Sequence, residues 1–255
     1  MKNQYDFTEG NILKQLIFFS GPIILANLLQ TSYQVVDSLW IGNLLGADAL
    51  GAVAISGAII FTMLSFVIGL NNAALTILSQ QKGKGSQQGL KNYLNAFVVT
   101  LTILAILFSV SGYILSEQLL KLLGTPDTLF PLAMDYLRIN FVGMLFLFGY
   151  NFISTVLRSI GDSKSPLKFV MIAVILNVFL DPLFIAGLNL GVKGAAYATI
   201  VAQGIAFIYG MYFVLRLKLA PFQLPRKPKL QEVKLILNLG IPAVLQMSII
   251  SAGSA

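Results

Sequence analysis

The chain has 255 residues, of which 56% are hydrophobic and 11% charged, and its formal net charge is +7. Soluble domains have about 25% charged residues, so this composition argues against a soluble enzyme and predicts a membrane protein. The chain has neither cysteine nor histidine, which removes disulfides, thiol nucleophiles, imidazole bases and the commonest zinc ligands.

Apolar segments long enough to span a bilayer follow one another along the chain. The first residues lack the basic region and cleavage site of a signal peptide, so we expect no cleaved leader. None of the segments alternates like a strand of a membrane barrel. The sequence therefore predicts an all-α polytopic membrane protein, with a six-helix transmembrane bundle and the start of a seventh helix. The spans are expected at about Leu13–Ile41, Ala52–Leu78, Tyr93–Leu115, Leu132–Leu157, Leu167–Ile185 and Gly194–Leu215, with the seventh beginning near Val233.

The first span carries a stripe of polar side chains that ends in a carboxylate. Counting back from Asp37, the residues three, four, seven and ten positions earlier are Gln34, Tyr33, Gln30 and Asn27. With 3.6 residues per turn, they share one face of a helix. A polar face on a helix otherwise suited to lipid should face a cavity or the protein interior. We predict that this stripe lines a substrate cavity; the alternative is a face that only packs within the bundle.

Two further residues are assigned by their place within a span. Asn151 lies in the fourth span and is predicted to line the cavity, or alternatively to bridge helices. Pro22 lies in the first span, where proline removes a backbone hydrogen bond. Pro22 is therefore a candidate hinge, with a static bend as the alternative.

A second carboxylate is expected at the depth of Asp37. Asp181 lies in the fifth span, with Asn177 one turn earlier on the same face, and Thr199 lies in the sixth span. At ~1.5 Å per residue, Asp37, Asp181 and Thr199 each lie roughly 8–9 Å in from a loop at the same side. The alternative for Asp181 is that Asp-Pro simply starts a turn at the helix end.

Two neighbouring carboxylates in a low-dielectric bundle attract a proton or a small cation. Amide and hydroxyl oxygens from Asn177 and Thr199 could complete a Na⁺ site, because hard cations prefer oxygen ligands. They could equally hydrogen-bond protonated aspartates. We predict that Asp37, Asn177, Asp181 and Thr199 form an ion-coupling site for H⁺ or Na⁺, with no catalytic residues and no cofactor.

The distribution of lysine and arginine predicts the orientation. With the amino terminus in the cytoplasm, 14 of the 17 basic residues fall on the inside. The three on the outside or its margin are Lys121, Arg138 and Lys193. This asymmetry follows the positive-inside rule. It predicts a multi-pass protein of the plasma (inner) membrane, and it explains the net charge without a nucleic-acid partner.

The start of the chain is partly repeated near its end. An offset of 220 positions carries Lys14 onto Lys234 and Pro22 onto Pro242, after a proline-rich, basic stretch. The predicted divisions are an amino-terminal lobe over residues 1–217, a cytoplasmic linker over 218–232, and the first helix of a second lobe over 233–255. We therefore expect a missing carboxy-terminal lobe, encoded by about 200 further residues of open reading frame.

Several ordered segments of the sequence resemble the multidrug and toxic compound extrusion (MATE) family of antiporters. They are Gly21-Pro22, VVDSLWIGNLLGADALGAVA from Val35, LRSIGDSKSPLKF from Leu157 and NVFLDPLFIAGLNLGVKGAAYATIVAQ from Asn177. The resemblance implies a twelve-helix protein of two six-helix lobes. It also implies export of organic cations, drugs or other amphiphiles in exchange for H⁺ or Na⁺, with Asp37, Asn177, Asp181 and Thr199 as the coupling cluster.

Two other functional classes are alternatives. A flippase for a lipid-linked saccharide or other lipid would have a similar helical architecture, usually with a more basic cavity. The sequence places no Lys or Arg deep within the spans, which argues against it. An intramembrane aspartyl protease would also use two aspartates. Neither Asp37 nor Asp181 follows glycine or tyrosine, so we expect no enzyme.

Overall fold

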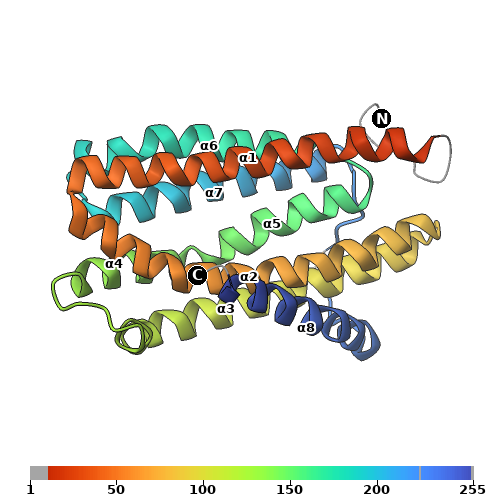
Figure 1. The fold of residues 1–255 in the computed structure, drawn as a ribbon. Helices are drawn as coiled ribbons and strands as arrows, with labels where there is room; N and C mark the ends of the chain where they lie inside the picture. The colour runs from red at the N-terminus through yellow and green to blue at the C-terminus, as the bar shows by residue number, and fades with distance from the viewer. Residues whose placement is uncertain (1–10, 224, 254–255) are drawn as a thin grey trace.

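The structure, a computed structural model, describes residues 11–223 and 225–253, and every regular element in these ranges is helical. The helices lie along one long axis (Figure 1). Five are long and apolar enough to cross a membrane, or up to six if the bent pair α4 and α5 is one span. The predicted all-α polytopic bundle is confirmed. Its elements are α1 (Ile12–Leu45), α2 (Ala47–Gly83), α3 (Gln87–Leu122), α4 (Phe130–Val142), α5 (Met144–Ser159), α6 (Lys164–Pro182), the π-helix η1 (Leu183–Gly187), α7 (Val192–Arg216) and α8 (Leu230–Gly253).

The connections alternate between the two ends of the bundle (Figure 1). The α1–α2 and η1–α7 connections lie at one end, and the α2–α3 and α5–α6 connections lie at the other. Gly46 alone joins α1 to α2, with φ +88°, a left-handed conformation that glycine adopts without a steric penalty. This single-residue turn sets α1 and α2 antiparallel and brings the polar stripe of α1 to the inner side of α2.

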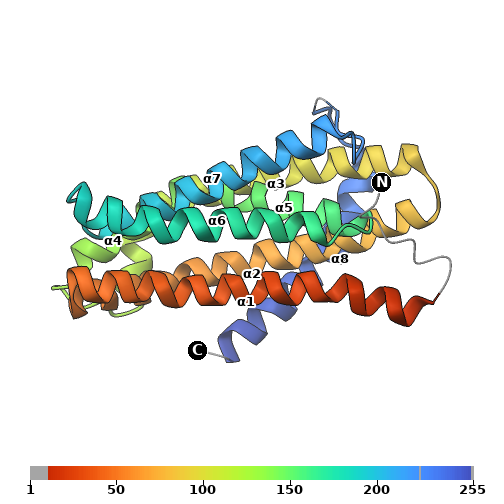
Figure 2. The same ribbon diagram turned by 90° about the horizontal axis from the view of Figure 1, so that it is seen from above.

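The helices form two groups with α5 between them (Figures 1 and 2). One group contains α1, α6 and α7, and the other contains α2, α3 and α8. The main core surrounds α5, chiefly where it packs against α2, α3 and α4, and its largest fully buried side chains include Phe97, Phe148 and Phe169. Apolar side chains on the outer faces, such as Leu28 and Leu39, are exposed, as expected for helices that contact lipid.

The fourth predicted span is not one straight helix. It consists of α4 and α5, which meet at Gly143 with a bend of 51°. A Cβ at Gly143 would lie 2.4 Å from Cγ1 of Ile200, so α7 approaches the chain closely at the bend. The fifth span also ends irregularly, because α6 continues beyond Pro182 into the π-helix η1. Both irregularities lie at the end of the bundle that holds the two aspartates.

The stretch between α7 and α8 is attached to the bundle. Ala220 is buried, and Phe222 packs against the main core. The side chain of Asn95 on α3 donates to the Arg226 carbonyl at 2.8 Å and accepts from the Arg226 amide at 2.9 Å. Beyond it, α8 lies against α2, where a Cβ at Gly69 would come within 2.6 Å of the Val244 backbone. The described residues of this stretch, 217–223 and 225–229, are therefore held to the bundle at Ala220, Phe222 and Arg226, and we call them the strap.

Candidate functional site

The polar stripe of α1 borders a cavity that contains Asp37. This cavity, which we call the Asp37 cavity, has a volume of about 310 Å³. Its walls come from α1, α2, α4, α5 and α7, and Gln30, Tyr33, Gln34 and Asp37 line it together. The stripe thus faces the interior of the bundle, while Leu25 and Leu28 on the other side of α1 are exposed. The 3.6-residue period alone was enough to predict this orientation.

Three helices bring the four predicted coupling residues together. The carboxyl groups of Asp37 on α1 and Asp181 on α6 lie within interaction distance of each other. The Asn177 side chain, one turn before Asp181, donates from Nδ2 to the Thr199 hydroxyl of α7 at 3.3 Å. Asp181 and Asn177 are buried, with 0% and 2% exposure. The group forms a compact set of oxygen atoms between α1, α6 and α7.

These oxygen atoms lack hydrogen-bond donors. Oδ1 of Asp37, both carboxylate oxygens of Asp181 and Oδ1 of Asn177 are buried and accept no hydrogen bond within the described part of the chain. Buried acceptors are costly when nothing donates to them. Within the described ranges, no three His, Cys, Asp or Glu side chains gather as a metal site. The atoms available to bind an ion are thus the oxygens of two carboxylates and of neutral side chains, which suit protons or one small hard cation.

Close packing of α7 against η1 sets the depth of Thr199. A Cβ at Gly194 would lie 2.6 Å from the carbonyl carbon and oxygen of Phe184, so only glycine permits this approach. Ala195, Ala198 and Ala202 on the same helix are also buried and small. Small residues allow close helix contact in membranes. The contact places Thr199 opposite Asn177, one turn before Asp181.

Sequence reasoning missed three residues beside this group. Tyr136 and Asn140 of α4 and Gln203 of α7 line the Asp37 cavity. Tyr136 is buried, with 7% exposure, and it lines the same cavity as Asp37. Tyr136 and Asn140 are four residues apart, as are Thr199 and Gln203. The spacing that revealed the stripe of α1 would have found both pairs.

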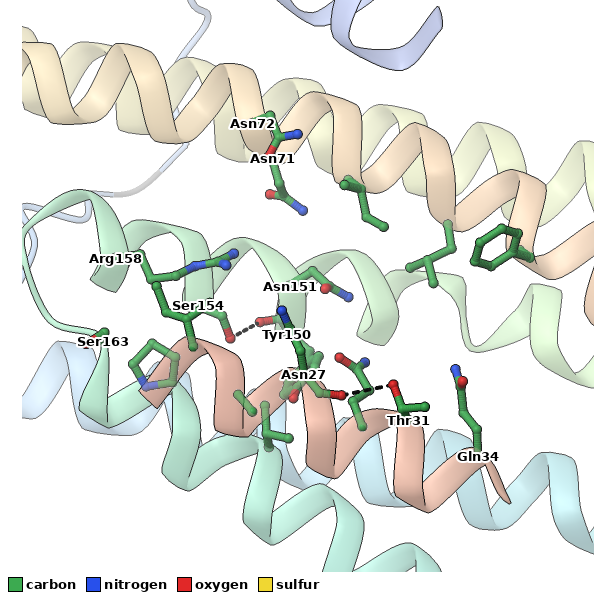
Figure 3. A pocket seen from close by; sticks show the side chains of 18 residues that line it. Asn27, Thr31, Gln34, Asn71, Asn72, Tyr150, Asn151, Ser154, Arg158 and Ser163 are labelled. Carbon is green, nitrogen blue, oxygen red and sulfur yellow. Dashed lines mark hydrogen bonds between the residues drawn. The ribbon is translucent and has the colours of Figure 1, made fainter. Parts of the chain in front are cut away.

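A second cavity adjoins the first and extends toward the other end of the bundle (Figure 3). It has a volume of about 450 Å³, and we call it the Arg158 cavity. Gln30 and Gln34 line both cavities. Asn27 and Asn151 line the Arg158 cavity but not the Asp37 cavity. Its polar walls are lined by Asn27, Gln30, Thr31, Gln34, Asn71, Asn72, Tyr150, Asn151, Ser154, Arg158 and Ser163.

The placement of Arg158 differs from the sequence prediction, which counted it among the loop residues. It lies in the last turn of α5, and its side chain extends into the cavity (Figure 3). Arg158 follows Asn151 by seven residues and Ser154 by four, so all three share one helix face. The same periodicity would have revealed this arginine. No Lys or Arg was predicted deep within the spans, and Arg158 lies at the end of one, but it still lines the cavity.

The candidate hinge Pro22 lies within a continuous helix. α1 is unbroken from Ile12 to Leu45, and Pro22 lies inside it, before the polar stripe begins. The described helix therefore places Pro22 about one and a half turns before Asn27 at 3.6 residues per turn. Movement about Pro22 remains a prediction.

Comparisons with known proteins identify the family. A family model described as MatE matches residues 22–183. The chain is 62% identical over 249 residues to the probable multidrug resistance protein YpnP of Bacillus subtilis, covering 98% of this chain and 56% of that protein. It is 30% identical to the probable multidrug resistance protein YoeA of Bacillus subtilis, covering 96% of this chain and 55% of that protein.

A solved structure has the same fold. It is an outward-facing conformation of a multidrug resistance MATE family transporter of the MOP superfamily, with a TM-score of 0.87 and 25% identity. The match covers 93% of this chain and 53% of the solved one. The chain thus spans about half the length of the curated relatives and of the structure that it matches.

Proposed function

Since the chain belongs to the MatE family of membrane transporters, we propose that it forms one lobe of an antiporter that exports organic cations, drugs or other amphiphiles. Entry of H⁺ or Na⁺ would drive the export. The ion would bind at Asp37, Asn177, Asp181 and Thr199. The substrate would occupy the adjoining cavities, where Asn27, Gln30, Tyr33, Gln34 and Asn151 lie.

The observation that carries this proposal is the pair of carboxylates with unsatisfied buried oxygens. Two carboxylates in a low-dielectric environment cannot both remain ionised without a compensating positive charge. A bound proton, Na⁺ or cationic substrate can supply that charge. Because Asp37 also lines the cavity, ion and substrate would compete for the same negative charge. Such competition is the basis of antiport.

The substrate class is inferred from the cavity walls and from the relatives. The Asp37 cavity combines amides and a carboxylate with apolar residues such as Phe61 and Leu64. Such a mixture suits an amphiphile that has an apolar body and a positive charge. The two relatives described above are named as probable multidrug resistance proteins, which favours drug export over a flippase for lipid-linked saccharides.

The working transporter would contain a second lobe. Residues 1–217 would form the lobe described here, 218–232 the connection, and 233–255 the first helix of the partner lobe. The matched relatives are about twice as long as the matched region, which supports this division. The fixed strap and the contact of α8 with α2 would set where the second lobe begins.

Transport by the two-lobe protein is testable in everted membrane vesicles. A lipophilic cationic dye should accumulate when a pH or Na⁺ gradient is imposed, and accumulation should stop when the gradient is dissipated. Separate H⁺ and Na⁺ gradients identify the coupling ion. Transport of a lipid-linked oligosaccharide without gradient-driven dye movement would contradict the proposal.

The proposed orientation places the amino terminus in the cytoplasm. The three basic residues at the opposite end each have a local partner. Lys121 contacts Glu117 at 2.6 Å, Lys193 contacts Asp135 at 3.2 Å, and Arg138 lies 5.2 Å from the Tyr113 ring centre. The excess of positive charge therefore lies at the end that would face the cytoplasm.

Cysteine labelling tests this orientation, and the native chain has no cysteine to obscure the result. Cysteines replacing the exposed residues Ala47 and Asn189 should react with a membrane-impermeant thiol reagent added to intact cells. Cysteines replacing exposed Gln87 and Lys227 at the other end should react only after the cells are permeabilised. The reversed pattern would overturn the proposed orientation.

A further inference from the structure

The Arg158 guanidinium lies in the wall of the Arg158 cavity without an acidic partner among the described residues. Its Nη2 atom donates to the Thr155 hydroxyl at 3.0 Å, and this bond holds one terminal nitrogen of the guanidinium against α5. Its Nε atom is buried and donates to no described acceptor. The ion pairs in the described ranges are Lys121–Glu117 and Lys193–Asp135, so Arg158 belongs to neither. A buried charge without a counter-charge is costly.

Asp162, the nearest acidic residue along the chain, uses its carboxylate oxygens in other hydrogen bonds. Its Oδ1 atom accepts from the amides of Lys164 and Ser165 at 3.1 and 3.0 Å. Its Oδ2 atom accepts from the Ser165 hydroxyl at 2.6 Å. These bonds cap the first turn of α6. Asp162 is buried and does not line the cavity, so no carboxylate of the residues that the structure describes lines it near Arg158.

Neutral polar side chains line the cavity on either side of Arg158. Asn71 and Asn72 reach it from α2, and Ser163 reaches it from the start of α6 (Figure 3). The Ser163 side chain is buried, with 1% exposure, and its hydroxyl has no hydrogen-bond partner in the described chain. Amide NH₂ groups, a hydroxyl and a guanidinium can each donate a hydrogen bond to an anion. Guanidinium binds carboxylate and phosphate oxygens especially well.

We propose that Arg158, Asn71, Asn72 and Ser163 form a subsite for an oxyanion, the carboxylate or phosphate of a bound amphiphile. The proposal rests on the proposed transport function and specifies its substrates more closely. The subsite lies at the opposite end of the joined cavities from Asp37. Asn27 of the Arg158 cavity and Asp37 are ten residues apart on α1, or about 15 Å at 1.5 Å per residue. One amphiphile can therefore place an anionic group at Arg158 while its apolar body passes Gln30 and Gln34.

The experiment measures ligand binding to the purified two-lobe protein and compares substitutions at Arg158 with a control substitution. The variants are Arg158→Gln and Arg158→Lys. The control is Arg216→Gln, because Arg216 is exposed and donates to the Tyr212 hydroxyl at 2.7 Å, away from the cavity. The probes are a lipophilic cationic dye, the same dye with an added carboxylate, and a short-chain phosphatidic acid. The second and third probes distinguish the carboxylate of a substrate from the phosphate of a lipid.

Arg158→Gln should weaken binding of the carboxylate dye, the phosphatidic acid, or both by at least tenfold. Arg158→Lys should lose less affinity for these anionic probes, because lysine keeps the positive charge, although it lacks the planar array of donors. The plain cationic dye should bind all variants as well as the native protein, which also shows that they are folded. Unchanged affinity of Arg158→Gln for both anionic probes would overturn the subsite. Failure of the proposed transport function would instead appear as loss of gradient-driven accumulation of the cationic dye in vesicles. The two failures are therefore distinguishable.

Discussion

Asp37→Asn and Asp181→Asn should each reduce ion-driven efflux to the background of vesicles without the transporter. Asparagine keeps the size and hydrogen bonding of aspartate, but it cannot exchange a proton or balance the charge of a cation. Asn177→Ala and Thr199→Ala should lower efflux only several-fold, because each removes a neutral ligand. The assay is dye efflux in vesicles with an imposed pH or Na⁺ gradient.

A matched control comes from an aspartate outside the cavity. Asp48 is exposed in the first turn of α2, so Asp48→Asn removes one negative charge without touching the buried oxygens. Its efflux should equal that of the native protein. Equal amounts of each variant in the membrane exclude a folding defect. Native efflux in both cavity variants would reduce Asp37 and Asp181 to structural polar residues.

Gly194→Ala is expected to have the largest effect on stability. Its added Cβ would meet the backbone of Phe184 at 2.6 Å, and backbone atoms cannot rotate away. The start of α7 must therefore move away from η1, at a cost of about 2–3 kcal/mol in the free energy of unfolding. Because α7 carries Thr199, the shift should also disturb the contact with Asn177.

The control is the same substitution in the same helix. A Cβ at Gly204 would lie 3.7 Å from the Phe146 ring, an ordinary van der Waals distance. Gly204→Ala should therefore be neutral, or gain up to about 1 kcal/mol from higher helix propensity. Thermal unfolding of the two purified variants in one detergent measures the difference. Equal melting temperatures would show that the close contact of α7 with η1 does not limit stability.

The length of the apolar segments was sufficient to predict the spans, and helix periodicity was sufficient to predict the face of α1 that lines the cavity. The stripe from Asn27 to Asp37 repeats every three or four residues, and this spacing determines a helix face without knowledge of tertiary contacts. Depth counting likewise placed Asp37, Asp181 and Thr199 at one level, and the structure brings them together. Local geometry decides these features.

Other features depend on contacts between distant segments. The break at Gly143 reflects the approach of Ile200 from α7, and nothing in the sequence around Gly143 specifies that neighbour. The strap is fixed by Asn95, which lies 131 residues from Arg226. The direction of the Arg158 side chain was predictable from its spacing to Ser154, but its basic character suggested a loop. Periodicity was the better guide there.

The most direct test of ion coupling is substrate binding to the two-lobe protein at several pH values and Na⁺ concentrations. Coupling is a free energy shared by two sites, so the ion that drives export must weaken substrate binding by the same factor by which substrate weakens ion binding. The native protein should show this dependence, with dye affinity falling as the coupling ion is added. Asp37→Asn and Asp181→Asn should bind dye with an affinity that no longer changes with pH or Na⁺. An unchanged dependence in both variants would contradict the assignment of the carboxylate pair as the coupling site.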